Sequence, residues 1–187
     1  MSIAASHVPH IPRIPHVPLR RSAPTSGPGV PLETDALRQL LRQQATTVTV
    51  VTVGGSRPVG FTATSFTSVS LDPPLVSVCL DRDSSSWAAM ERARHIAVHL
   101  LGAGQEHVAA TFATSGIDRF AAYTDWRRGP HGVPLLGGTV AWLVCRVVEI
   151  VPAGDHAIVL SEPVVGDHSP GAAPLVYHDG AYGTLDR

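Results

Sequence analysis

The side chains best suited to chemistry lie in two neighbouring segments rich in hydroxyl groups. The first, Val59 to Val76, joins two apolar stretches and carries its hydroxyls without the clustering of charges, Gly or Asn that is typical of an ordinary solvated loop. The second, Asp81 to Ser86, ends in three consecutive serines. Because a hydroxyl both donates and accepts hydrogen bonds, the first segment predicts a cradle for one polar, flat ligand.

The Asp81–Ser86 loop adds a cation to these hydroxyls. Arg82 and the serines come just before a short helix that begins near Trp87, so a guanidinium, hydroxyls and free helix amides come together. Such groups can hold a phosphate. The alternative is that the loop only caps the helix and that Arg82 is solvated.

Other catalytic chemistries find less support. No Gly-x-Ser-x-Gly elbow is present to serve the Asp155-His156 pair, and paired zinc-ligand signatures are absent. The run Gly102 to His107 follows a predicted strand and opens a helix, as a dinucleotide-binding loop does. His107 occupies the position where the third glycine of such a loop would stand, and no predicted strand follows to carry a ribose-binding acid. We therefore interpret it as an ordinary strand-to-helix turn.

Composition limits the class of partner. The chain has 187 residues and a net charge of −1, which indicates one domain with no electrostatic footprint for nucleic acid or a membrane surface. It contains no lysine and no asparagine, so arginine, histidine, hydroxyls or backbone amides must bind any anionic ligand.

The cysteines and the N-terminus point to the cytoplasm. Cys79 and Cys145 lie in apolar, strand-like runs, where buried free thiols are expected, although the spacing leaves a disulfide open. The N-terminal residues lack the apolar region of a signal peptide, and no apolar run is long enough to span a membrane.

Two regions are expected along the chain. Residues 1–31 are punctuated by prolines and predict a flexible Pro/His-rich arm, in which a metal site at His7, His10 and His16 is disfavoured because the chain is not preorganised. Residues 32–187 predict one folded domain.

The sequence predicts that the domain over residues 32–187 is mainly β with short helices. Strands are expected over 46–53, from Pro58 onward, and over 75–80, 96–101, 139–151 and 156–165, with a hairpin around Asp179-Gly180. Short helices are expected over 35–44, with Thr34 as cap, and over 87–93 and 105–112, whereas Trp126–Pro134 is expected to be irregular. Six or more strands with short helices favour a β-barrel over a doubly wound sheet.

The same segments carry a family resemblance. Residues 60–76 and 79–86, followed in order by Asp118-Arg119-Phe120, Gly154-Asp155-His156 and Tyr177 to Tyr182, strongly resemble the short-chain flavin reductases of two-component monooxygenases. The resemblance runs from about residue 35 to 187. It implies an FMN-binding split β-barrel with Greek-key-like strand connections, usually a homodimer, that reduces free flavin with NADH or NADPH.

The resemblance also implies roles for individual residues. His156 would approach the nicotinamide and is the catalytic candidate, acting as a positioning group, and Tyr182 would help to close the pocket. The other cofactor-binding candidates are those around the flavin ring and ribityl chain (Thr62, Ala63, Thr64, Ser65), those around the phosphate (Ser68, Asp81, Arg82, Ser84, Ser85, Ser86) and two in the pocket wall (Phe112, Arg119). His99 and Thr64 depart from residues common in the family, which leaves the flavin and nicotinamide preference open.

The expected function follows from this resemblance. The enzyme would be an NAD(P)H:flavin oxidoreductase that transfers hydride from the nicotinamide to FMN or FAD and releases reduced flavin to a partner monooxygenase or halogenase. Two alternatives stay open: a non-catalytic flavin- or haem-binding split barrel, and an oxidase that retains FMN. No metal, nucleic acid or membrane partner is expected.

Overall fold

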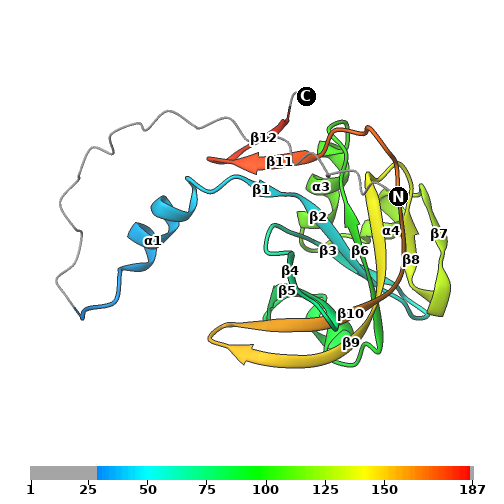
Figure 1. Ribbon diagram of the computed structural model, residues 1–187, viewed down its shortest axis with the longest axis horizontal. Coiled ribbons are helices and arrows are strands. Elements are labelled where there is room, and N and C mark those ends of the chain that lie inside the picture. Colours follow the sequence, from blue (N-terminus) through cyan, green and yellow to red (C-terminus); the bar gives the residue numbers. More distant parts are fainter. Residues whose placement is uncertain (1–28, 186–187) are drawn as a thin grey trace, which may run out of the picture.

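The structure of the protein is a computed structural model that describes residues 29–185 (Figure 1). The predicted arm, with His7, His10 and His16, lies almost wholly outside the described residues, so its boundary at residue 31 stays a prediction.

Seven antiparallel strands form the main sheet, in the order β3-β2-β6-β9-β10-β5-β4. Their bounds are β2 Thr49–Val53, β3 Val59–Ala63, β4 Thr67–Leu71, β5 Pro74–Asp81, β6 His95–Leu100, β9 Ala141–Ala153 and β10 His156–His168. The β-branched and apolar runs that predicted these strands supply their buried faces. The expected strands at 75–80, 96–101, 139–151 and 156–165 are confirmed within a few residues.

The sheet curls so that its β3 edge approaches β5 without pairing to it. The Ser65 hydroxyl, just after β3, accepts a hydrogen bond from the Cys79 amide of β5 at 2.9 Å and lies 3.3 Å from the Cys79 carbonyl oxygen. We call this gap between β3 and the end of β5 the seam. The expected mainly β fold is confirmed, and the seam leaves strand edges free for a ligand.

The β9–β10 hairpin is the longest element of the sheet and wraps around its lower side (Figure 1). Its tight turn at Gly154-Asp155 requires a positive φ of 66° at Gly154, which suits glycine. The Asp155 carbonyl accepts a hydrogen bond from the Arg82 amide at 3.0 Å, so the turn is tied to the loop after β5.

A smaller three-stranded sheet contains β1 Thr46–Thr47, β11 Leu175–His178 and β12 Ala181–Thr184. The predicted strand 46–53 is therefore divided at Val48, whose amide and carbonyl pair with Leu175 and Leu101. The chain changes sheets there because Val48 has partners on both sides. The expected hairpin around Asp179-Gly180 is confirmed.

The helices are short, as expected, with some corrections. They are α1 Thr34–Leu41, α2 Trp87–Met90, α3 Glu106–Ala113 and α4 Arg119–Ala122. Thr34 is the first helical residue and Glu33 takes the N-cap position without a side-chain cap, so the expected Thr34 cap is wrong. The sequence also did not predict α4, which the Asp118 carboxylate caps by accepting hydrogen bonds from two amides.

The segment expected to be irregular, Trp126–Pro134, begins a small hairpin. Strands β7 Trp126–Arg128 and β8 Pro134–Leu136 flank a 3-10 turn, η1 Pro130–Gly132. His131 in this turn has a φ of 56°, and its ring stacks on that of His95 with centroids 3.8 Å apart.

The two larger of three apolar clusters found within residues 29–185 surround the site. The first fills the barrel between β2, β3, β5, β6, β9, β10 and α2, and the second lies under α3 and α4, where Phe112 is fully buried. Both cysteines are free thiols; Cys145 is buried, which raises its pKa to about 12, whereas Cys79 is only half-buried, contrary to expectation.

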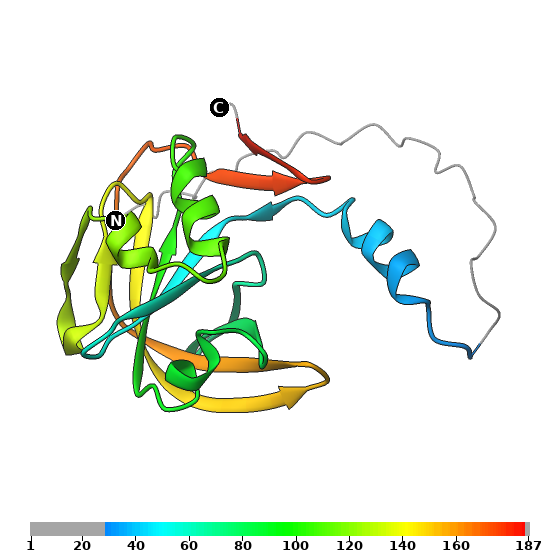
Figure 2. The same ribbon diagram turned by 180° about the vertical axis from the view of Figure 1, so that it is seen from behind.

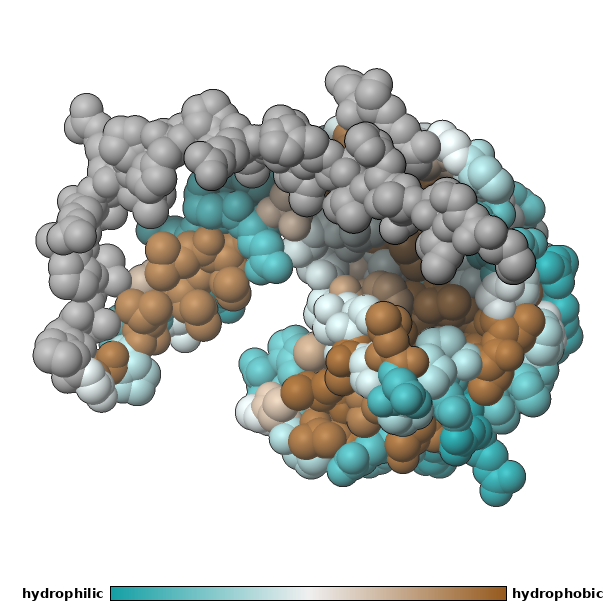
Figure 3. All heavy atoms as spheres, in the orientation of Figure 1, coloured by the Kyte–Doolittle hydropathy of each residue, from teal (hydrophilic) through white to brown (hydrophobic). Residues whose placement is uncertain are grey.

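Helix α1 stands away from the barrel with no buried residue (Figures 1 and 2). Its side chains Leu37, Leu40 and Leu41 are 44–58% exposed and form an apolar surface in the space-filling view (Figure 3). Within residues 29–185, no helix has both the length and the apolar character needed to cross a bilayer.

Candidate functional site

A cavity of about 690 Å³ opens along the seam and gathers most of the predicted site residues. We call it the seam cavity. Its walls come from β3 and the residues after it, the end of β5, the Asp81–Ser86 loop, the end of α3 and the start of β10. Segments far apart in sequence therefore meet around one space.

On the β3 side of the seam cavity, two of the predicted hydroxyl groups are bonded to the backbone of the protein itself. Thr62 donates its hydroxyl to the Ala109 carbonyl of α3 at 2.7 Å, and Ser65 is bound to Cys79. Thr64 is exposed, with no side-chain hydrogen bond among the described residues, while Ala63 is buried in the cavity floor. The expected hydroxyl cradle is thus partly structural, since two hydroxyls fix its shape and Thr64 is left for a ligand.

The serine loop divides in the same way. Ser84 and Ser85 line the seam cavity with Asp81, whereas Ser86 is 1% exposed and lies 3.4 Å from the Gly60 carbonyl as a hydrogen-bond donor. Ser85 is exposed and its hydroxyl makes no hydrogen bond within residues 29–185. Ser84 and Ser85 are the hydroxyls available for an anion.

The cation beside these serines is Arg119 rather than Arg82. Arg119 donates to the Gly60 carbonyl at 2.6 Å, the Ser86 hydroxyl at 3.1 Å and the Thr114 carbonyl at 2.9 Å, and it lines the cavity. Burial lowers its pKa, yet a guanidinium stays protonated. Arg82 instead stacks over the Trp87 ring at 5.9 Å, outside the cavity.

His156 lies at the cavity rim, where β10 pairs with the end of β5 opposite Asp81. Its Nδ1 is 2.7 Å from the Asp155 carboxylate, and this hydrogen bond lowers the pKa of Asp155. With Nδ1 so oriented, Nε2 is the ring atom free to meet a ligand. The ring is 45% exposed, so it can contact a ligand that arrives from solvent.

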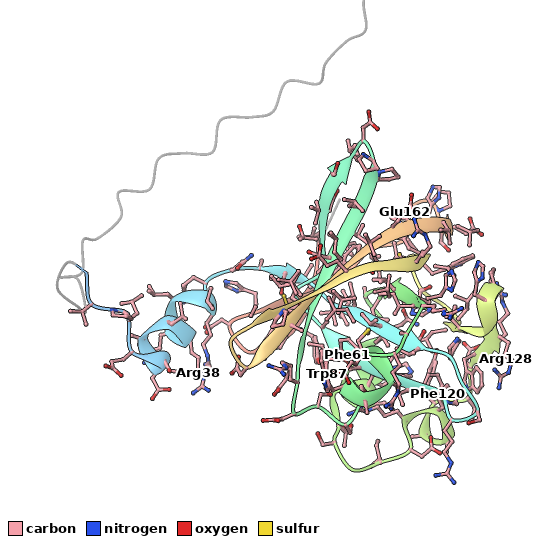
Figure 4. All side chains as sticks on the ribbon, turned by 90° about the horizontal axis from the view of Figure 1, so that it is seen from below. Arg38, Phe61, Trp87, Phe120, Arg128 and Glu162 are labelled. Carbon is pink, nitrogen blue, oxygen red and sulfur yellow. The ribbon has the colours of Figure 1, made fainter. Side chains whose placement is uncertain are left out.

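Phe112 forms the inner wall, packed edge-on against Phe120 at 5.3 Å. Its ring lies so close to β3 that a Cβ on Gly60 would meet it at 2.8 Å. Glycine at this position lets β3 and α3 approach and sets the depth of the cavity. Figure 4 shows Phe61 close to Trp87, with which it shares an apolar cluster, and Phe120 farther toward Arg128.

Four predicted residues lie outside the seam cavity: Ser68, Arg82, Ser86 and Tyr182. Ser68 is exposed on β4, and Tyr182 stacks on Tyr177 in the small sheet. Sequence reasoning missed six lining residues: Phe61, Cys79, Leu80, Asp83, Ala113 and Ser115. Cys79 and Leu80 lay in a segment already singled out, whereas nothing in the sequence marked Ser115.

A larger hollow of about 830 Å³ joins the seam cavity at Thr64 and Ser65. It runs between the end of α1, β1 and the Asp179 turn, with Arg38 and Arg42 on the α1 side. The free face of the Thr64–Ser65 segment is therefore open to a second ligand or to another chain.

The seam cavity fits a flavin mononucleotide on chemical grounds. Its volume lies in the range of about 300–1,000 Å³ typical of small-molecule sites. Free strand edges can donate amide hydrogens to a ring with carbonyl groups, and Ser84, Ser85 and Arg119 can bind a phosphate. Among the described residues no cluster of three potential metal ligands occurs.

Comparison with known proteins places these features in a family. The flavin reductase like domain family matches residues 41–186. The chain is 45% identical over 150 residues to the NADH:FMN oxidoreductase of Rhodococcus erythropolis, which covers 78% of this chain and 78% of that protein.

Solved structures agree. The NADH:FAD oxidoreductase of Streptomyces globisporus, in complex with NAD and FAD fragments, superposes with a TM-score of 0.77 at 40% identity, over 80% of this chain and 91% of that one. The flavin reductase component of a bacterial two-component tryptophan halogenase superposes with a TM-score of 0.77 at 38% identity. This match covers 83% of this chain and 100% of that one. The split-barrel fold is that of these reductases.

Proposed function

We propose, from the premise that this chain belongs to the flavin reductase like family, that it transfers hydride from NADH or NADPH to FMN or FAD. The observation that carries the proposal is the seam cavity, where free backbone edges, two serine hydroxyls and Arg119 surround a space of about 690 Å³. The enzyme is an NAD(P)H:flavin oxidoreductase, in agreement with its relatives.

When bound, the flavin supplies the ring atom that accepts hydride from the nicotinamide. The chain itself supplies alignment. Thr62 and Ser65 hold β3 in place through their bonds to Ala109 and Cys79, so that the floor under the ring is rigid. Alignment of two reactants can contribute roughly 7–11 kcal/mol to lowering a barrier.

The phosphate end is held by Ser84, Ser85 and Arg119. Arg119 is fixed by three protein acceptors, and its Nη2 amino group makes no hydrogen bond within residues 29–185, so it can donate to a phosphate oxygen without rearranging. One arginine and two hydroxyls form a modest anchor. We infer that flavin binds loosely enough to leave after reduction.

His156 is the positioning group for the nicotinamide. Asp155 orients the ring through Nδ1, which leaves Nε2 to hydrogen-bond an amide group at the rim. Hydride transfer needs no obligatory general acid, so we assign His156 no proton-transfer role. Ser68, Arg82 and Tyr182 stay proposals for cofactor contacts, whereas we infer that Ser86, which is buried, acts by holding Arg119 and Gly60 in place.

The partner we propose is a flavin-dependent monooxygenase or halogenase that receives reduced flavin by diffusion, because one relative is the reductase component of a two-component halogenase. We further propose a homodimer, since the exposed leucines of α1 form an apolar surface that the rest of residues 29–185 leaves uncovered. Two free thiols suit the reducing cytoplasm, where we place the enzyme.

Steady-state oxidation of NADH and NADPH with FMN, FAD and riboflavin tests the function. We expect turnover only when flavin is added. Absence of turnover with every pair would overturn the assignment. An intensely yellow purified protein that turns over an organic substrate without added flavin would favour an oxidase that retains FMN, and bound flavin or haem without NAD(P)H oxidation would favour a non-catalytic module.

A further inference from the structure

A hollow of about 630 Å³ lies away from the seam cavity and shares none of its lining residues with it. We call it the basic hollow. Its polar and charged walls come from the β2–β3 turn, from the turn between α2 and β6, and from η1. It is therefore separate from the proposed flavin site.

The titratable side chains that line the basic hollow are all basic. They are Arg57 of the β2–β3 turn, Arg92 and Arg94 of the turn before β6, His95 at the start of β6, and His131 of η1. No acidic side chain of residues 29–185 lines the hollow. The ion pairs within the same residues use Arg38, Arg146 and His156, so the three lining arginines have no acidic partner there. This unbalanced charge suits an anionic ligand.

Close packing fixes two of the loops that carry these cations. A Cβ on Gly54 would lie 2.5 Å from the Gly132 carbonyl oxygen, so glycine lets the β2–β3 turn rest directly against η1. The Thr52 hydroxyl donates to the Pro134 carbonyl at 2.7 Å and ties β2 to β8. Figures 1 and 2 both show the β2–β3 turn beside the β7–β8 hairpin. The two loops thus form a fixed wall.

Two of the lining side chains form a stacked pair. The His131 ring lies on the His95 ring with centroids 3.8 Å apart and planes 4° apart. Burial, and then the charges of His131, Arg146 and Arg94, lower the pKa of His95, although Arg146 is itself paired with Glu162. An anion in the hollow would offset these charges and would raise the pKa of His95 again.

We propose that the basic hollow binds a polyphosphate anion, either free pyrophosphate or the phosphates of a nucleotide. Phosphate is favoured because its several anionic oxygens match guanidiniums that come from two different turns. The volume exceeds the needs of one phosphate and lies in the range of about 300–1,000 Å³ typical of small-molecule sites. This site is independent of the proposed function, since the seam cavity contributes no residue to it.

Isothermal titration calorimetry of the full chain with pyrophosphate, and in parallel with ADP, at constant ionic strength tests the proposal. The double variant Arg92→Ala with Arg94→Ala removes two exposed side chains and should raise the Kd for pyrophosphate about tenfold or more, because charge-assisted hydrogen bonds are lost. The matched control, Arg127→Ala with Arg128→Ala, removes two arginines that do not line the hollow and should bind as the wild type does. A lower Kd for ADP than for pyrophosphate would identify a nucleotide as the source of the phosphates, and the reverse order would identify the free anion.

Proton NMR of the histidine rings gives a second readout, in which pyrophosphate should raise the pKa of His95. Absence of binding to the wild type overturns the proposal, as does an unshifted His95 titration or an equal loss in the control. An equal loss in Ser84→Ala with Ser85→Ala would place the anion in the seam cavity instead. A KM for NADH raised by the Arg92 and Arg94 changes alone would assign the hollow to the nicotinamide dinucleotide and would also overturn the proposal. Calorimetry needs no turnover, so its result is distinct from failure of the proposed reaction.

Discussion

His99 lies in the middle of the main sheet with both ring nitrogens hydrogen-bonded. Nδ1 donates to the Val50 carbonyl at 3.0 Å, and Nε2 accepts the Leu136 amide at 3.2 Å, which fixes the neutral ring. The side chain is fully buried, and this burial lowers its pKa to about 4 despite the bond to Val50. Protonation of Nε2 would place its N–H group opposite the Leu136 N–H group, so that this hydrogen bond would be lost.

This gives a pH dependence of stability. In the unfolded chain His99 takes up a proton near pH 6.5, whereas in the folded chain it does so only near pH 4. The contribution of neutral His99 to the free energy of unfolding is therefore fully present above pH 6.5 and is lost as the pH falls toward 4. Linkage puts the loss between pH 7 and pH 5 at about 2 kcal/mol. Urea unfolding at both pH values measures it. His99→Gln, which keeps a donor and an acceptor, should flatten the difference; an equal loss in this variant would contradict the assignment to His99.

At the cavity rim, His156→Ala tests the positioning role. A lost hydrogen bond of about 0.5–1.5 kcal/mol predicts a two- to tenfold higher KM for NADH, with a smaller change in the Kd for flavin. Steady-state kinetics and dialysis supply the two numbers. His168→Ala, at the far end of the same strand, is the control, and equal losses for NADH and flavin would show that His156 does something else.

At the scale of the elements, the packing of β3 against α3 depends on one small residue, Gly60. Gly60 lets the strand lie against the Phe112 ring, and its carbonyl also accepts from Arg119. The floor of the seam cavity and the cation at its phosphate end are therefore set by the same close approach.

Gly60→Ala should consequently cost about 1–3 kcal/mol of stability, because the added methyl cannot fit without moving β3 or Phe112. Thermal unfolding measures this, with Gly104→Ala as control, since a Cβ there meets nothing within 4 Å. Weaker flavin binding should accompany the Gly60 change. Equal melting temperatures for both variants would show that β3 can relax away from α3.

At the scale of the whole molecule, the rest of residues 29–185 leaves the apolar face of α1 uncovered. Leu37, Leu40 and Leu41 follow helical spacing, yet none is buried (Figure 3). A short helix with so little packing is only marginally stable by itself, because most helical stability in proteins comes from tertiary packing. A second copy that covers this face would supply it.

We therefore expect a homodimer by light scattering after gel filtration, and replacement of the three leucines by glutamine should weaken it about tenfold or more. Gln39→Ala, on the opposite face of α1, should leave the assembly intact. A wild-type chain that runs as a monomer would contradict the homodimer.

The sequence by itself determined the local features: the β-branched runs that form strands, the Asp-Gly hairpin, the hydroxyl-rich segments and the family resemblance. These depend on neighbours along the chain. Tertiary structure alone decided that Arg82 lies outside the cavity, that Ser86 is buried while Ser85 is free, and that Ser115 joins the site. Those outcomes depend on how the sheet curls to bring β3, β5 and α3 together, and contacts between such distant segments leave no local pattern to read.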